Sequence, residues 1–269
     1  MQTTKSYTEQ ARSSVDFGRA ALDYRRHRAG FPDALFTRLA VHGIGVAGQR
    51  LLDLGTGTGS LARGFALRGC RVTGLDPSEN LMAQARELDA EALVSIDYVT
   101  ARAEDTGLPA QMFDVVAAGQ CWHWFDRPRA AAEGWRLLRP GGILLSTHFD
   151  WLPLPGSFVA ATEQLIRSHN PAWGGHGGHG IHTKEFADFS GAGFHSLQSF
   201  SFDVDVPYSH EGWRGRIRAS AGISASLPPD AVAAFDAEHS AMLARDFPQE
   251  RLLAPHRVFA LIGYKSFEC

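Results

Sequence analysis

The sequence predicts an α/β protein built on a mostly parallel β-sheet. Five short apolar stretches have the composition of strands, at 50–54, 71–75, 93–100, 112–119 and 143–148. Stretches with helical periodicity lie between them, at 60–68, 80–88 and 129–138, and the connections are short. Strands that alternate with helices in this way form βαβ units, in which successive strands run parallel.

The glycine-rich stretch LLDLGTGTG, at 51–59, joins the first strand to the first helix. A short apolar run followed by a glycine at every second position is typical of a buried strand that enters a tight turn. Glycine has no Cβ and tolerates positive φ, so the backbone of this turn can touch a ligand. Asp53 precedes the turn. We therefore expect a ligand site here.

The composition narrows the possible partners. The 269 residues carry a net charge of −3, which disfavours nucleic acid and anionic membranes as partners. No apolar run reaches the ~18 residues of a membrane span, and the first residues lack the apolar core of a signal peptide. Three widely spaced cysteines argue against a disulfide framework. These features predict a cytoplasmic protein, which we expect to be a monomer or homodimer.

Segments of a different character flank the alternating region. Residues 1–40 are expected to form lid helices, which break near Gly30 and Pro32 and include the basic segment YRRHR. Beyond residue 150 we expect a helix at 158–169, an edge strand at 194–206, helices within 209–247 and an apolar strand at 258–264. This pattern predicts three parts: lid helices at 1–40, a binding core at 41–150, and at 151–269 the remaining core strands with an inserted cap.

The glycine turn by itself fits two classes of cofactor. Residues 57–62 satisfy the dinucleotide pattern GxGxxA, and Asp76 follows where a ribose-binding acid belongs. A nicotinamide-dependent oxidoreductase is therefore one interpretation. Asp53 weighs against it, because its carboxylate would repel a diphosphate but would attract an ammonium group.

Five motifs in order resemble the class I S-adenosylmethionine-dependent methyltransferases. They are LLDLGTGTG, VTGLDPSENLMAQAR, ARAEDTGLP, FDVVAAGQCWHWFD and LLRPGGILL, and they cover about residues 50–148. The resemblance is greatest to the small-molecule group that includes trans-aconitate methyltransferase-like enzymes. The segment ALDYRRHRAGFP of this chain also resembles the lid sequence of that group. It implies a Rossmann-like seven-stranded sheet, parallel except for one late strand, with N-terminal lid helices and a C-terminal helical cap. It also implies transfer of a methyl group to an O, N, C or S atom of a small molecule, or a catalytically silent protein that binds the cofactor.

The resemblance implies a position for each part of S-adenosylmethionine. Asp53 would lie near its amino group, Asp76 would accept hydrogen bonds from the ribose hydroxyls, and Glu104 would accept one from adenine. Asp76 could instead cap a helix, and Glu104 could be a solvated loop carboxylate. The full set of implied cofactor residues is Tyr24, Arg28, Asp53, Gly55, Gly57, Gly59, Asp76, Pro77, Ser78, Ala103, Glu104 and Gln120.

The residues that meet the methyl acceptor are less defined by sequence. The stretch WHWF follows the fourth strand, so Trp122 and Trp124 are candidate substrate contacts and His123 a candidate base, although such aromatic clusters are more often core. The further substrate candidates are His179, Trp213, Arg214 and Arg218, for which a solvated loop or helix face is the alternative. His176, His179 and His182 have no cysteine or acid at ligand spacing, so no metal site is predicted.

Overall fold

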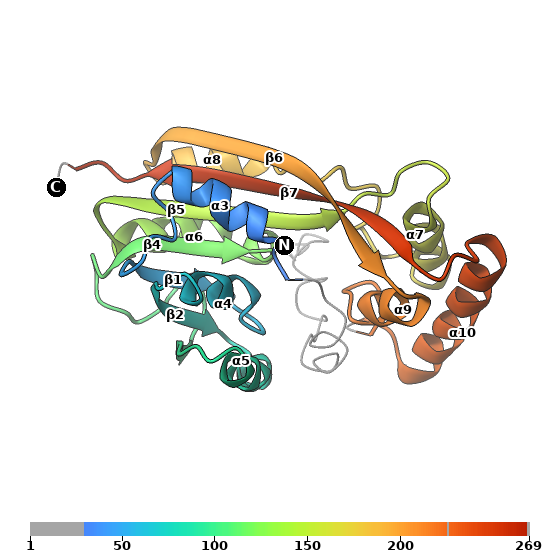
Figure 1. Cartoon of the computed structure of the whole chain (residues 1–269). Helices are drawn as coiled ribbons and strands as arrows, with labels where there is room; N and C mark the ends of the chain where they lie inside the picture. Colours follow the sequence, from blue (N-terminus) through green and yellow to red (C-terminus); the bar gives the residue numbers. More distant parts are fainter. Residues whose placement is uncertain (1–29, 225, 268–269) are drawn as a thin grey trace, which may run out of the picture. The chain divides into compact units, whose positions relative to one another are not determined.

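The computed structural model describes residues 30–224 and 226–267, and these form two compact units (Figure 1). One unit, here called the core unit, comprises 30–150, 180–204 and the described residues from 257 onward. The other, the helical unit, comprises 151–179 and the described residues of 205–256. The predicted lid residues Tyr24 and Arg28 lie outside the described residues.

Seven strands form one sheet in the order β3-β2-β1-β4-β5-β7-β6. The strands are β1 (Arg50–Leu54), β2 (Arg71–Asp76), β3 (Asp97–Thr100), β4 (Phe113–Gly119), β5 (Leu138–Trp151), β6 (His195–Tyr208) and β7 (Leu252–Tyr264). The pairs β1–β2, β1–β4, β2–β3 and β4–β5 are parallel. The predicted seven-stranded α/β sheet is therefore confirmed.

Strand β7 runs against both of its neighbours. Along β5, Gly142 accepts a hydrogen bond from Lys265 at 2.9 Å, whereas Leu152 donates one to Pro255 at 2.7 Å, so residue numbers rise on one strand as they fall on the other. On the β6 side, Arg257 pairs with Asp203, and a Cβ on Gly263 would lie 3.0 Å from Leu197. The single late antiparallel strand is the one that the sequence predicted.

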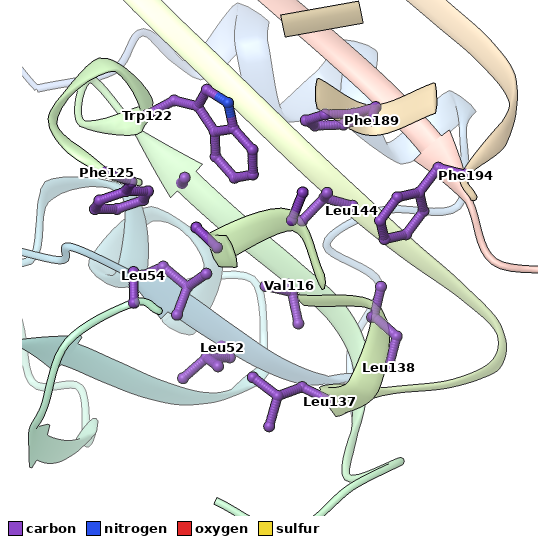
Figure 2. Packing of buried hydrophobic residues seen from close by; sticks show 14 of the residues in the cluster. Leu52, Leu54, Val116, Trp122, Phe125, Leu137, Leu138, Leu144, Phe189 and Phe194 are labelled. Carbon is purple, nitrogen blue, oxygen red and sulfur yellow. The ribbon is translucent and has the colours of Figure 1, made fainter. Parts of the chain in front are cut away.

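The helices of the core unit are α3 (Asp33–Val41), α4 (Ser60–Ala66), α5 (Glu79–Glu91), α6 (Arg127–Leu137) and α8 (Lys184–Gly191). The apolar faces of α6 and α8 and the sheet bury a continuous core (Figure 2). In it, Val116 of β4 and Leu144 of β5 lie with Phe189 of α8, each fully buried. Helix α8 was not predicted, because only Phe186 and Phe189 mark an apolar face in its eight residues.

Two predicted boundaries were wrong for local reasons. The segment RPGG does not precede the fifth strand but lies within β5, since Leu138 already pairs with Phe113 and Ile143 with Val115. The extra residues form a bulge in which Gly141 has φ +75°. The third strand begins at Asp97 rather than at residue 93, because Leu93 is 93% exposed with φ +56° and cannot continue a strand.

The helical unit has its own hydrophobic core. Its helices are α7 (Phe158–His169), α9 (His210–Arg218) and α10 (Pro229–Asp246), all three close to the predicted segments. Ile166, Trp213 and Phe235, one from each helix, are fully buried in one cluster. Among the described residues no helix is both long and apolar enough to cross a bilayer.

Candidate cofactor site at the glycine turn

The glycine turn between β1 and α4 requires its glycines. Gly55, Gly57 and Gly59 have φ of +64°, +56° and +76°, which L side chains rarely adopt. A Cβ on Gly55 would lie 2.9 Å from the Cys121 sulfur, and one on Gly59 would lie 2.8 Å from the Tyr98 hydroxyl. A Cβ on Gly57 would meet no atom within 4 Å. Protein side chains therefore fill the space beside Gly55 and Gly59, whereas the space beside Gly57 is open.

This difference predicts different consequences for the substitutions Gly55→Ala and Gly57→Ala. Both introduce a side chain at positive φ, which costs about 1–2 kcal/mol. Gly55→Ala adds the clash with Cys121, so we expect it to lower the free energy of unfolding further than Gly57→Ala does. Gly57→Ala places a methyl group in open space and should mainly weaken ligand binding. Urea denaturation of both variants tests this, and equal destabilisation would contradict it.

Asp53 is a buried carboxylate with one unused oxygen. Its side chain is 1% exposed, and Oδ2 accepts a hydrogen bond from the Thr56 hydroxyl at 2.7 Å. Oδ1 has no hydrogen-bond partner among the described residues. Burial raises the pKa of Asp53 to about 7, and the nearby Asp76 contributes to the rise. A cationic donor at Oδ1 would satisfy this oxygen and favour the ionised form.

Asp76, the last residue of β2, is fixed by two backbone N–H groups. Gly57 donates to Oδ2 at 2.9 Å and Ser78 donates to Oδ1 at 2.8 Å. Burial raises the pKa of Asp76, and these two bonds oppose the rise. The N-cap of α5 is Ser78, whose hydroxyl accepts from Leu81, so Asp76 is not the helix cap. Each carboxylate oxygen keeps a second lone pair for a ligand hydroxyl.

The residues that the sequence assigned to adenine have other contacts. Glu104 Oε1 accepts the backbone N–H of Asp126, the N-cap of α6, at 2.8 Å. Its other oxygen lies 3.5 Å from Arg102. The Ala103 side chain is 4% exposed and packs in the core, and the role implied for this residue, donation from its backbone N–H to adenine, stays a prediction. The adenine role of Glu104 stays a prediction, and the structure shows that this side chain supports α6.

The chain turns sharply after β4. Gln120 has φ +62°, its N–H donates to Thr147 of β5 at 2.8 Å, and its side-chain amide donates to Phe149. Trp122, in the short helix Trp122–Trp124, is fully buried, and its indole N–H donates to Asp188 at 3.0 Å. Its proposed contact with substrate is not supported, because the ring belongs to the core (Figure 2). Trp124 is partly buried against the same cluster.

Three histidines and two carboxylates meet near this turn. His148 Nε2 lies 2.7 Å from Glu185 Oε1, and His182 Nε2 lies 2.7 Å from Asp150 Oδ2. The imidazole rings of His148 and His182 stack with their centroids 3.5 Å apart, and the ring centroid of His123 lies 6.1 Å from that of His148. Surrounding protein atoms lower the pKa of His123, and charge on His148 would lower it further.

Sequence reasoning missed His148, Asp150 and Glu185. The signal in β5 was the polar residues at 146, 148 and 150, which alternate at the end of an apolar strand and so point to one face. Glu185 carried no comparable signal, because it follows a glycine-rich loop and its helix was not predicted. We name His148, Asp150, His182 and Glu185 the histidine–carboxylate cluster.

The other predicted substrate residues belong to the helical unit. Trp213 is fully buried there, and its indole N–H donates to Thr162 at 3.0 Å. Arg214 and Arg218 of α9 both pair with Asp236 of α10. His176 and His179 are exposed. These contacts give the three residues structural roles, since Trp213 forms a core and the two arginines join two helices, and their roles as substrate contacts stay predictions.

Comparison with known proteins identifies the family of the central region. Residues 52–146 match the family described as "Methyltransferase domain". An uncharacterised methyltransferase of Mycobacterium tuberculosis is 36% identical over 131 residues, 49% of this chain and 51% of that protein. The malonyl-[acyl-carrier protein] O-methyltransferase of Enterobacter lignolyticus is 37% identical over 143 residues, 52% of this chain and 54% of that protein. The chain thus spans about half the length of these curated relatives.

Solved structures extend the likeness beyond this region. A candidate type II methyltransferase of Anaeromyxobacter dehalogenans is 25% identical with a TM-score of 0.62, covering 89% of this chain and 98% of that one. The phosphoethanolamine N-methyltransferase 2 of Haemonchus contortus has a TM-score of 0.58 at 18% identity, covering 99% of this chain and 61% of that one. Residues 52–146 of this chain thus match the methyltransferase domain family, and the seven-stranded sheet that contains them has the class I methyltransferase fold.

Proposed function

We propose that this protein is an S-adenosylmethionine-dependent methyltransferase that acts on a small-molecule acceptor. The observation that carries the proposal is Asp76, which two backbone N–H groups hold at the end of β2 with lone pairs to spare. This carboxylate can bind the two hydroxyls of a ribose. The match of residues 52–146 to the methyltransferase domain supports it.

The geometry of the turn fits this cofactor better than a dinucleotide. The unpartnered Oδ1 of Asp53 suits the ammonium group of a methionine moiety, and the open space at Gly57 lets that moiety approach the backbone. A diphosphate at the same place would meet the buried Asp53 carboxylate, whose charge would repel it. The nicotinamide alternative therefore finds no support in this site.

Methyl transfer requires little of the protein beyond the positioning of the two reactants. When bound, the cofactor supplies a methyl group already activated by its sulfonium. The residues of the turn hold the reactant in line and exclude water, an effect that can reach about 7–11 kcal/mol of the barrier. A base is needed only for an acceptor that carries a proton, and His123 is the candidate. Because the E. lignolyticus relative is named an O-methyltransferase, we favour oxygen as the methylated atom.

Calorimetric titration tests the proposed cofactor. We expect micromolar binding of S-adenosylhomocysteine and no comparable binding of NADH. Release of S-adenosylhomocysteine from S-adenosylmethionine in the presence of phenol, alcohol, amine and carboxylate panels then tests catalysis. Tight NADH binding without S-adenosylhomocysteine binding would refute the proposal, and cofactor binding with no turnover would favour a silent binding protein.

The raised pKa of Asp53 predicts how cofactor affinity depends on pH. In the free protein this carboxyl titrates near 7, above its ordinary value of 3.8, so it is largely protonated below neutral pH. A bound ammonium stabilises the carboxylate, and binding below the pKa must release the proton. We expect the affinity for S-adenosylhomocysteine to rise about tenfold from about pH 6 to about pH 8. Asp53→Asn should bind more weakly and lose this dependence; a dependence that persists in the variant would contradict the assignment.

The titration of Asp53 also affects the free energy of unfolding, but with a pH dependence opposite in sign to that of cofactor affinity. The folded protein without cofactor holds the Asp53 proton between about pH 4 and 7, whereas the unfolded chain has lost it. The contribution of Asp53 to the free energy of unfolding therefore falls as pH rises through this window.

A further inference from the structure

We propose that the histidine–carboxylate cluster is a binding site for one divalent transition-metal ion of the zinc class. His148, Asp150 and His182 each place a possible ligand atom within 4.8 Å of the others. Two imidazoles and one carboxylate form a donor set that suits zinc and other first-row divalent ions. The site shares no residue with the proposed cofactor contacts.

The charges of the cluster favour a cation. The two carboxylates each lie 2.7 Å from a histidine nitrogen, Glu185 from His148 Nε2 and Asp150 from His182 Nε2. Within the described part of the chain, no lysine or arginine forms an ion pair with either of them. With neutral imidazoles the cluster carries two negative charges, which one divalent ion would neutralise.

Two buried atoms of the cluster lack partners. His148 is 0% exposed, and its Nδ1 makes no hydrogen bond in the described residues. The same holds for Glu185 Oε2, on a residue 3% exposed. Buried polar atoms are rarely left without a hydrogen-bond partner. An unpaired one therefore points to a partner that the structure does not contain, such as an ion. An ion bound to His148 Nδ1 would supply one.

Glu185 is placed to orient His148. We assign the Nε2–H of His148 as the donor to Glu185 Oε1, which fixes the tautomer and leaves the Nδ1 lone pair for the ion. Histidines that bind metals commonly donate their other N–H to a carboxylate in this way. Glu185 is therefore a positioning residue, and the ligands are His148, Asp150 and His182.

Metal binding requires one local rearrangement. The imidazoles of His148 and His182 are stacked with an angle of 11° between their planes, and nitrogen lone pairs lie in the ring plane. Both rings can reach one ion only if one of them tips out of the stack. The His182 side chain is 28% exposed and lies in the segment before α8, so it is the ring free to move. The ion then takes the place of the hydrogen bond between His182 Nε2 and Asp150 Oδ2, and the neutral imidazole of His182 keeps its one proton on Nδ1.

This arrangement also explains why the sequence predicted no metal. The three histidines at 176, 179 and 182 were considered together, with no acid at ligand spacing. The fold instead joins His182 to His148 and Asp150, which precede it by more than thirty residues and end strand β5. His176 and His179 are not in the cluster.

Metal titration of the full-length protein tests the proposal. After treatment with a chelator, we expect the protein to bind one equivalent of Zn²⁺ by calorimetry and to show visible absorption bands with Co²⁺. His182→Gln and Asp150→Asn should each weaken Zn²⁺ binding by at least about 10–100-fold, and Glu185→Gln by about tenfold with the stoichiometry retained.

Matched variants separate this site from chance binding by surface histidines. His176→Gln removes an exposed histidine outside the cluster and should leave Zn²⁺ affinity unchanged. Binding of S-adenosylhomocysteine by every variant reports folding and tests the proposed function separately. No Zn²⁺ bound, or Zn²⁺ bound equally by wild type, His182→Gln and Asp150→Asn, would overturn the metal site and leave the methyltransferase proposal intact.

Discussion

Asp76→Ala is expected to abolish measurable binding of S-adenosylhomocysteine. In the proposed complex the carboxylate accepts a hydrogen bond from each ribose hydroxyl, and a hydrogen bond to a charged group contributes about 1.5–3 kcal/mol. Loss of both should raise the dissociation constant by at least about 100-fold. Calorimetric titration measures the effect directly.

The control must separate lost contacts from lost structure. Asp76→Ala also removes the acceptor for the N–H groups of Gly57 and Ser78, so its melting temperature has to be measured beside its affinity. Asp97→Ala removes an exposed carboxylate from the start of the adjacent strand and should bind like wild type. If Asp76→Ala bound the cofactor as tightly as Asp97→Ala, the ribose assignment would be wrong.

The largest loss of stability is expected from Trp213→Ala. The indole is fully buried and makes edge-to-face contacts with Phe158 and Tyr208, with ring centroids 5.2 Å apart in both pairs. Its removal leaves a cavity in the core of the helical unit and takes away the hydrogen bond that the indole donates to the Thr162 hydroxyl. Substitutions of this kind cost about 3–5 kcal/mol. Urea denaturation followed by circular dichroism measures the cost.

Two comparison variants make this result specific. Leu154→Ala, at a side chain that is 50% exposed in the same unit, should change the free energy of unfolding by at most about 0.5 kcal/mol. Trp213→Phe keeps an aromatic ring but loses the hydrogen bond to Thr162, and it should fall between the two. A loss for Trp213→Ala no greater than that for Leu154→Ala would mean that the ring is not the centre of this core.

The sequence predicted the parallel part of the sheet because its signals are local. The run LLDL is apolar except for Asp53, and the strand it forms is buried at every residue from 51 to 54. The spacing of Gly55, Gly57 and Gly59 predicted a tight turn, and their positive φ values explain why glycine stands at these three positions. Asp53 and Asp76 could be singled out for the same reason, since each stands at the end of a strand.

The histidine–carboxylate cluster and the core of the helical unit could not be predicted in this way. Their contacts join residues far apart in sequence, such as His148 with Glu185 and Trp213 with Thr162. A tryptophan or an arginine on an amphipathic helix has the same local pattern whether it faces a ligand or a neighbouring helix. Arg214 illustrates this, because only the fold shows that Asp236 is its partner.

The place of β7 in the sheet has a consequence for biosynthesis. This strand is the last of the seven in sequence, yet it lies between β5 and β6. While a nascent chain lacks residues 252–264, the facing edges of β5 and β6 have no partner, and unpaired strand edges promote association between chains. The parallel strands β1 to β4 can pair as they leave the ribosome, but the sheet closes only after translation has passed β7. Ribosome-bound chains stalled before residue 252 should therefore be more sensitive to protease and more dependent on chaperones than chains stalled well beyond it.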